Sequence, residues 1–216
     1  APACDLALAL AVDISGSVDP KEFTVQMQGL ADALRDSVVS EALVRAEAAV
    51  LLVQWTGSSR QDVSIPWTRI TTYGDAEALA QRIESTPRRW RNFSTAIGEA
   101  LMFTSDQWSD APLCKRNIID VSGDGPSNEG ALPREAHAAL QAAGITVNAL
   151  AIEESEADLT AYFYENVIRG EGAFVVTANR FSDYPDRIRM KLIRETTAQL
   201  SCALDCTAFM RLKDEG

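Results

Sequence analysis

Small oxygen-bearing side chains alternate in the segment Asp13-Ile14-Ser15-Gly16-Ser17, which directly follows the longest apolar run of the chain, residues 6–12. The alternation lets Asp13, Ser15 and Ser17 point toward one spot, and Gly16 permits the tight turn that this arrangement needs. Carboxylate and hydroxyl oxygens bind hard cations such as Mg²⁺, Ca²⁺ or Mn²⁺ rather than metals that prefer soft ligands. The same side chains also cap helices. The segment alone therefore favours a cation site and a helix cap about equally.

Two later segments carry the same kind of chemistry. Thr95 stands at the predicted start of a helix, and Asp124 lies in the glycine-flanked loop Gly123-Asp124-Gly125 just after a predicted strand. All three segments fall at the same edge of the predicted sheet. The predicted ligands of one divalent-cation site are therefore Asp13, Ser15, Ser17, Thr95 and Asp124.

The elements that must position these residues follow from the hydrophobic pattern, in which apolar β-type runs alternate with helical periodicity. Strands are predicted at residues 6–13, 48–55, 62–66, 117–121, 145–152 and 173–177. Helices are predicted at residues 20–36, with Asp19 as N-cap, and at 75–84, 95–107, 133–143, 156–168 and 183–200.

This alternation predicts a doubly wound α/β fold, in which helices cover both faces of a mainly parallel six-stranded sheet. Residues 62–66 are expected to form one antiparallel edge strand, where Pro66 is tolerable. In open sheets of this kind, ligands collect at the carboxyl ends of the strands, near the point where the strand order reverses. The chain shows no repeat or long linker. We expect a single domain spanning 1–216, with a core of about residues 5–200 and a short tail at 201–216.

The charge balance limits the kinds of partner. The 31 acidic and 20 basic residues give a net charge of −11, which disfavours nucleic acid or an anionic membrane surface because their phosphates would be repelled. No apolar run is long enough for a transmembrane segment. The acidity suits a protein that gathers cations, and it equally suits one that is simply kept soluble.

The cysteines indicate the redox compartment. Cys4, Cys114, Cys202 and Cys206 form no C-x-x-C pair and the single histidine, His137, is distant in sequence, so a Cys/His zinc site is not expected. An even count suits one or two disulfides and an oxidising compartment. The start Ala1-Pro2-Ala3-Cys4 reads as a processed N-terminus. We therefore expect an extracytoplasmic protein, periplasmic or secreted, whose signal peptide has been removed.

Taken together and in this order, the three oxygen-rich segments resemble the von Willebrand factor A, or integrin I, domain, over about residues 5–200. The metal-ion-dependent adhesion site (MIDAS) of that family combines D-x-S-x-S, a later threonine and an aspartate in a D-G turn. The resemblance implies that Ser15, Ser17 and Thr95 bind the cation directly, and that Asp13 and Asp124 act through water or, in an alternative state, directly. The family often has Gly-Gly-Thr where Ser94 precedes Thr95 here, a departure that could shift this loop. Residues 11–23, 91–101 and 120–130 also resemble a bacterial family of uncharacterised extracytoplasmic A-domain proteins.

The resemblance implies a function as well. We expect a non-enzymatic, metal-dependent protein-binding domain that accepts an Asp or Glu of a partner protein at the metal. Mg²⁺ is the expected cation, with Ca²⁺ and Mn²⁺ as alternatives. The rival hypothesis is a metal-dependent hydrolase or phosphatase with Asp13 as nucleophile. A haloacid-dehalogenase-like enzyme would need a second acidic residue where Ser15 stands, and a suitably placed lysine.

The A-domain strand order also implies a disulfide between Cys4 and Cys114, since each precedes a strand and those two strands are parallel neighbours in the family. Pairing of Cys4 with Cys202 or Cys206 is the main competitor.

Several further residues are open to more than one interpretation. Arg88, Arg89 and Arg91 form a basic patch that is either a solvated loop or a docking surface for an acidic partner. Asp120 is expected to face the interior in a structural hydrogen-bonding role, and His137 is expected to be structural. Ser122 and Asn128 are expected to lie near the site without binding the cation.

Overall fold

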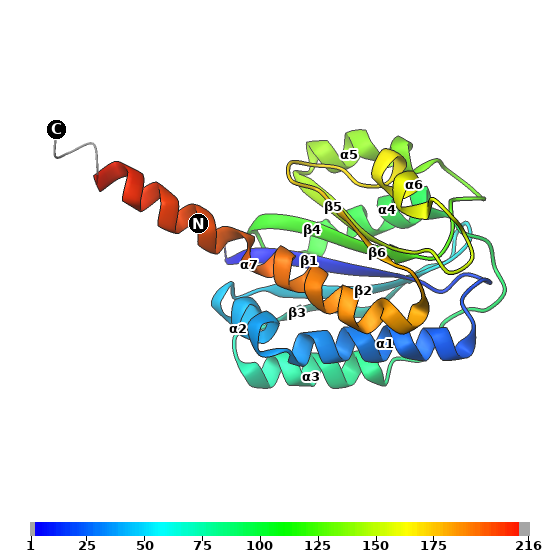
Figure 1. Ribbon diagram of the computed structural model, residues 1–216, viewed down its shortest axis with the longest axis horizontal. Coiled ribbons are helices and arrows are strands. Elements are labelled where there is room, and N and C mark those ends of the chain that lie inside the picture. Colours follow the sequence, from blue (N-terminus) through cyan, green and yellow to red (C-terminus); the bar gives the residue numbers. More distant parts are fainter. Residues whose placement is uncertain (1–2, 212–216) are drawn as a thin grey trace.

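The computed structural model describes the backbone of residues 3–211 and the side chains of residues 3–197. Its sheet has six strands in the order β3-β2-β1-β4-β5-β6 (Figure 1). The strands are β1 (Cys4–Asp13), β2 (Ala49–Trp55), β3 (Gln61–Arg69), β4 (Cys114–Gly123), β5 (Ile145–Ile152) and β6 (Val175–Ala178). Only β3, at one edge, pairs antiparallel to its neighbour in the described sheet. The predicted fold class is confirmed.

Helices cover both faces of the sheet, as Figure 1 shows. One face carries α1 (Pro20–Arg35), α2 (Ser37–Arg45), α3 (Tyr73–Glu84) and α7 (Tyr184–Arg211). The other carries α4 (Ile97–Asp106), α5 (His137–Ala142) and α6 (Leu159–Asn166). Short 3-10 turns occur at Gln107–Asp110, Pro133–Ala136 and Phe181–Asp183. Among the described residues no helix is both long and apolar enough to cross a bilayer.

The central strand β1 explains why the layers pack as they do. Its side chains alternate between the two faces, so Leu6, Leu8 and Leu10 join the core under α1 and α7, whereas the small Ala9 and Ala11 join the core under α4. Both sets are almost fully buried. A continuous apolar run is typical of a parallel strand that is covered on both sides.

The helix α1 begins as predicted. The side chain of Asp19 accepts hydrogen bonds from the backbone N–H groups of Lys21 and Glu22, and the Glu22 side chain accepts one from the Asp19 N–H. This capping box satisfies donors that would otherwise lack partners at the helix start. The helix then ends at Asp36, whose side chain caps α2 by accepting from Val38 and Val39. Helix α2 was not predicted from the sequence.

Several boundaries also differ from the predicted ones. The helix predicted from residue 95 begins at Ile97, so Thr95 lies in the preceding loop. Residues 133–143 divide into a 3-10 turn and α5, which begins at His137, and α6 is shorter than residues 156–168. Strand β3 is longer than residues 62–66 and contains Pro66, which its edge position and the irregular pairing register with β2 accommodate.

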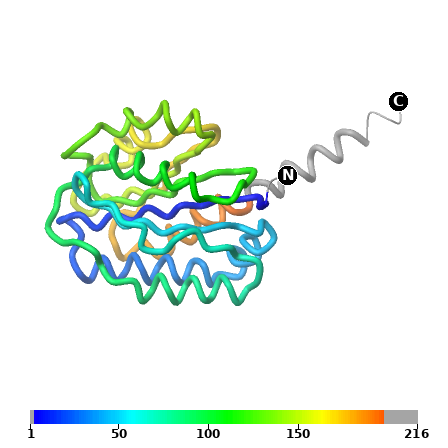
Figure 2. The backbone as a smooth tube through the Cα atoms, turned by 180° about the vertical axis from the view of Figure 1, so that it is seen from behind, coloured from blue at the N-terminus to red at the C-terminus, as the bar shows by residue number. Residues whose placement is uncertain are grey.

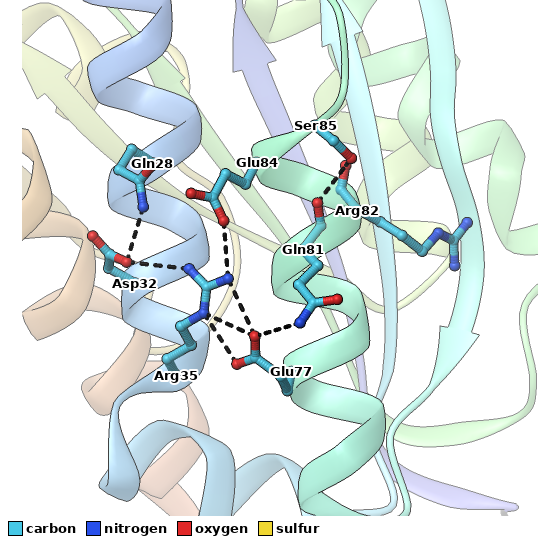
Figure 3. Close-up of polar contacts among 8 residues, drawn as sticks. All are labelled: Gln28, Asp32, Arg35, Glu77, Gln81, Arg82, Glu84 and Ser85. Carbon is cyan, nitrogen blue, oxygen red and sulfur yellow. Dashed lines mark hydrogen bonds and ion pairs between the residues drawn. The ribbon is translucent and has the colours of Figure 1, made fainter.

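A charged network joins α1 to α3 on the side of these helices that faces away from the sheet (Figure 3). The guanidinium of Arg35 on α1 donates to Glu77 and Glu84 on α3, at 3.0 and 2.9 Å, and to Asp32 at 3.3 Å. These groups are partly exposed. The network connects the two helices across their solvent-facing sides.

A second charged cluster lies beneath α7 and is fully enclosed. Lys191 Nζ lies 2.6 Å from Asp120 Oδ1 on β4 and 2.7 Å from Glu195 Oε1, and Asn148 on β5 donates to the same oxygen of Glu195. Asp120 therefore does face the interior, in an ion pair with Lys191.

A disulfide joins the amino ends of the two central strands. Cys4 and Cys114 are register partners in the parallel pairing of β1 and β4, and they are bonded as predicted. Cys202 and Cys206 lie outside the residues whose side chains are described. Seen from behind (Figure 2), β1 runs from this bridged end toward the loops at the opposite end of the molecule.

Candidate metal centre

The predicted ligands occupy the carboxyl edge of the sheet, where the strand order changes direction. Asp13 is the last residue of β1, Asp124 directly follows β4, and these two strands are neighbours. Ser15 and Ser17 lie in the loop between β1 and α1, and Thr95 lies two residues before α4. This edge is where the topology of an open parallel sheet places ligand sites.

Three of the five side chains are connected by direct hydrogen bonds, and the Asp13 carboxylate joins them through the backbone of Ser15. The Ser15 and Ser17 hydroxyls are 3.2 Å apart, and the Ser17 hydroxyl donates to Asp124 Oδ1 at 2.7 Å. The Ser15 backbone N–H donates to Asp13 Oδ1 at 2.7 Å. The structure thus brings Asp13, Ser15, Ser17 and Asp124 into one cluster.

Thr95 is fixed through its backbone to the loop that follows β4. Its N–H donates to Asn128 Oδ1 at 2.9 Å, and its carbonyl accepts from the Asn128 N–H at 2.9 Å. The Ser127 hydroxyl also donates to that carbonyl. The preceding loop reaches the serines through the Gly16 N–H, which donates to the Phe93 carbonyl at 2.7 Å. The role of Asn128 is therefore to hold the loop that carries Thr95.

Asp13 is the most deeply buried of the predicted ligands. Its side chain is fully buried, and its Oδ2 has no hydrogen-bond partner among the described residues. A Cβ added at Gly123 would lie 3.2 Å from this oxygen and 3.2 Å from the Phe163 ring, so a larger residue there would press on the Asp13 carboxyl group. Burial, followed by the nearby charge of Asp124, raises the pKa of Asp13 to about 7.

Burial also opposes ionisation of the Asp124 carboxyl group. Burial raises its pKa, against the hydrogen bond from Ser17, which favours the ionised form. Two carboxyl groups held close together in a poorly solvated place repel each other when both are ionised. A cation between them and the hydroxyls would remove that repulsion.

The donor set fits a hard divalent cation. In the described part of the chain, no three Asp, Glu, His or Cys side chains are arranged so that they could hold a metal ion, so hydroxyls would have to complete the coordination. Two carboxylates and three hydroxyls provide only oxygen donors, as Mg²⁺, Mn²⁺ and Ca²⁺ prefer. Asp13 Oδ2 is buried without a hydrogen-bond partner, and a cation bound to it would supply the missing interaction.

One residue of the basic patch has a different role from either interpretation of that patch. Arg88 is turned inward, and its guanidinium donates to backbone carbonyls of the loop between β1 and α1. Arg89 remains exposed and lies 3.4 Å from Asp62. Nothing in the sequence separates Arg88 from its neighbours, because its partners lie about seventy positions away.

His137 takes no part in the site. It begins α5 on the face that carries α4 and α6, and burial lowers its pKa. Ser122 is buried near the end of β4, two residues before Asp124.

The chain matches a family model described as a protein of unknown function, DUF1194, over residues 3–200. No curated protein matches it. Solved structures do. The mussel byssus proximal thread matrix protein 1 is similar with a TM-score of 0.68 and 20% identity, over 89% of this chain and 49% of that one. A further structure of that protein is described as having a zinc-occupied MIDAS motif, with a TM-score of 0.65 and 21% identity.

Two bacterial structures are similar as well. A von Willebrand factor type A protein from Catenulispora acidiphila has a TM-score of 0.58 and 16% identity, over 89% of this chain and 43% of that one. The conserved hypothetical protein BatB from Bacteroides thetaiotaomicron has 0.53 and 21%, over 89% of this chain and 99% of that one. The chain spans about half the length of the mussel protein. At these identities the likeness shows the fold alone, which is that of a von Willebrand factor A domain.

Proposed function

The chain belongs to the DUF1194 family of proteins of unknown function and has the von Willebrand factor A fold, and on this premise we propose that it is a metal-dependent protein-binding domain. Asp13, Ser15, Ser17, Thr95 and Asp124 hold one divalent cation, with Mg²⁺ favoured and Ca²⁺ or Mn²⁺ as alternatives. A partner protein completes the site with an Asp or Glu side chain. The observation that carries this proposal is the convergence of carboxylates and hydroxyls at the switch point of the sheet.

The arrangement suits capture of a carboxylate. When bound, a hard divalent cation supplies an electrophilic centre that accepts a carboxylate oxygen. Ser15, Ser17 and Thr95 offer neutral oxygens, so they leave most of the positive charge for a partner. Asp13 and Asp124 provide the negative charge that holds the cation. Since hard cations take six or more oxygens, three hydroxyls leave positions that exchangeable water and then a partner can fill.

The comparisons supply support of two kinds. A protein with the same fold has a MIDAS motif that is occupied by zinc, which makes a divalent cation reasonable at the matching edge of this sheet. The Cys4–Cys114 disulfide supports an extracytoplasmic location, because such bonds persist in oxidising compartments. We propose a periplasmic or secreted protein.

No contact favours the hydrolase alternative. Lys191 is fully buried, and its contacts are with Asp120 and Glu195 rather than with Asp13. Asp13 Oδ1 accepts the Ser15 N–H, and its other oxygen is buried, so neither is well placed to attack a substrate.

Calorimetric titration of Mg²⁺, Mn²⁺ and Ca²⁺ into the purified chain tests the metal site, followed by capture of envelope proteins from the source cell with and without chelator. We expect one bound cation, and a partner that is released by chelator and recovered when Mg²⁺ or Mn²⁺ is returned. Ser15→Ala and Thr95→Ala should lose the partner while they remain folded, whereas Ser37→Ala, an exposed serine on α2, should keep it. Capture that survives full metal removal in the folded protein would contradict the mechanism.

A further inference from the structure

Arg88 makes an unusual set of contacts for an arginine beside an acidic site. Its Nη1 donates to the Val18 carbonyl at 2.7 Å, and its Nη2 donates to the Ile14 and Ser15 carbonyls, each at 2.9 Å. Its Nε donates to the Trp90 carbonyl at 2.8 Å. Among the described residues it forms no ion pair with a carboxylate. All four side-chain hydrogen bonds of Arg88 therefore go to backbone carbonyls.

Three of these carbonyls bracket the segment that carries the serine hydroxyls. Ile14 and Ser15 lie on one side of Ser17, and Val18 lies on the other. One rigid, planar group thus fixes both ends of the turn, as several donors in a fixed geometry allow. The Val18 N–H closes the same turn onto the Ser15 carbonyl at 3.1 Å.

The same contacts decide which oxygens a cation can use. A carbonyl that accepts a hydrogen bond from a cationic guanidinium is a poor ligand for a second cation, because both compete for the same lone pairs. The hydroxyls of Ser15 and Ser17 lie outside these contacts and pair with each other and with Asp124. The loop therefore offers its serine hydroxyls, while the carbonyls of Ile14, Ser15 and Val18 are already engaged by Arg88.

We propose that Arg88 is a positioning residue of the metal centre, which fixes the loop between β1 and α1 and keeps the Ile14, Ser15 and Val18 carbonyls out of the coordination sphere. This inference rests on the proposed function. It has a consequence for metal choice. Ca²⁺ tolerates flexible sites and often takes backbone carbonyls, whereas Mg²⁺ demands near-octahedral geometry and keeps several waters. A fixed loop in which Arg88 occupies the Ile14, Ser15 and Val18 carbonyls favours the smaller ion.

The test is titration of Mg²⁺ and Ca²⁺ into the wild-type chain, Arg88→Ala and Arg88→Lys, with Arg89→Ala as the matched control on the adjacent exposed arginine. We expect Arg88→Ala to weaken Mg²⁺ binding by about 10- to 100-fold, the usual effect of removing a group that orients metal ligands. Ca²⁺ binding should weaken less, so the preference for Mg²⁺ should fall. Arg89→Ala should change neither value. Free guanidinium at a low, non-denaturing concentration should partly restore Mg²⁺ binding to Arg88→Ala, whereas ammonium should not.

Arg88→Lys covers the case in which the alanine variant does not fold. Lysine keeps the charge and most of the stem but lacks the planar fork, so it should also lose preference for Mg²⁺. If the wild type binds no divalent cation, the proposed function and this inference fall together. If the wild type binds but both Arg88 variants keep its Mg²⁺ affinity and its Mg²⁺-to-Ca²⁺ ratio, only the role of Arg88 is wrong.

Discussion

The carboxyl group of Asp13 lies where burial and the charge of Asp124 both oppose its ionisation. Its pKa is raised from 3.8 in the unfolded chain to about 7 in the folded protein. The folded state therefore binds the proton more tightly, and the stability that this contributes is lost as the pH rises from about 4 to about 7. The shift corresponds to an upper value of about 4 kcal/mol. A bound cation that neutralises the Asp13 carboxylate should restore the stability lost at high pH.

Asp13→Asn separates these effects. In the presence of chelator, the free energy of unfolding of the variant should rise relative to the wild type as the pH goes from 4 to 8. Added Mg²⁺ at pH 8 should stabilise the wild type and leave the variant unchanged, because the variant lacks the charge that holds the cation. Urea titration of both proteins at several pH values gives the comparison. A constant difference between them across this range would show that Asp13 is not the group that titrates.

For single residues, the sequence predicted the place of side chains that recur at a regular spacing, but it did not predict the contacts of isolated ones. Asp13, Ser15 and Ser17 could be proposed because alternate positions in one short segment point together. Arg88 could not be distinguished from Arg89 and Arg91, because the three share a segment and only the fold brings one of them to the carbonyls of Ile14 and Val18. The interior position of Asp120 was predictable, but its partner Lys191 was not.

Helix α7 is attached to the sheet through the buried cluster of Lys191, Asp120 and Glu195. Lys191→Met should destabilise the protein by about 3–5 kcal/mol, because it leaves two buried carboxyl groups without their cation. Burial, followed by the charge of Asp120, raises the pKa of Glu195 to about 8. The stability contributed by protonated Glu195 is therefore lost as the pH rises from about 4.5 to about 8.

Glu195→Gln should remove that dependence and should be better tolerated at pH 9 than at pH 5, relative to the wild type. The amide oxygen can still accept from Lys191 and Asn148. Thermal unfolding of the two single variants and the wild type at pH 5 and 9 makes the measurement. Equal losses in both variants at both pH values would contradict the assigned role of charge.

The network around Arg35 should behave differently, because its members are partly exposed. Arg35→Ala should cost about 1 kcal/mol or less, since ion pairs near water contribute little. The loss should shrink further in high salt, which screens exposed charges. Chemical denaturation with urea at low and high ionic strength measures it. A salt-independent loss of several kcal/mol would mean that α1 and α3 depend on this contact for their packing.

The Cys4–Cys114 disulfide should stabilise the protein without affecting the metal centre. Replacing both cysteines by alanine should cost about 2–4 kcal/mol, mainly because the unfolded chain regains freedom. The bridge and Asp13 are at opposite ends of a ten-residue strand, or about 30 Å apart at 3.3 Å per residue. Mg²⁺ affinity should therefore be unchanged in the double variant. Titration and unfolding of the same preparation test both halves of this prediction.

Elements whose ends are marked by glycine, proline or polar residues were predicted well, and elements without such residues were not. The run at residues 6–13 ends in polar residues, and Gly144 ends a helix with the positive φ of 64° that glycine tolerates. Helix α2 follows α1 without any glycine or proline, because Asp36 ends one helix and caps the next. Its Val38 and Val39 also disfavour helix by propensity. Pro66 made β3 look shorter than it is, since the irregular pairing that accommodates the proline is set by the neighbouring strand.

For the whole molecule, the metal centre links three separated segments that come together only in the folded state. We propose that residues 1–216 form a single domain with its core in about residues 5–200, which predicts one cooperative unfolding transition. A cation at about 100 times its dissociation constant should add about 2.7 kcal/mol to stability and raise the melting temperature. Differential scanning calorimetry with chelator and with Mg²⁺ shows both. A second unfolding transition whose temperature does not change with added Mg²⁺ would contradict the single-domain proposal.

The positions of the disulfide and the metal centre at the two ends of β1 also govern how the molecule resists pulling. A load applied between a partner at the metal and the amino end of β1 runs along this strand. Both neighbours of β1 are parallel to it, so the hydrogen bonds on its two sides are loaded in shear and must fail together. The Cys4–Cys114 bond prevents β1 from sliding past β4. Oxidation thus makes the central strand pair a mechanical tie, and the force needed to unfold the domain along this axis should drop when the bond is reduced.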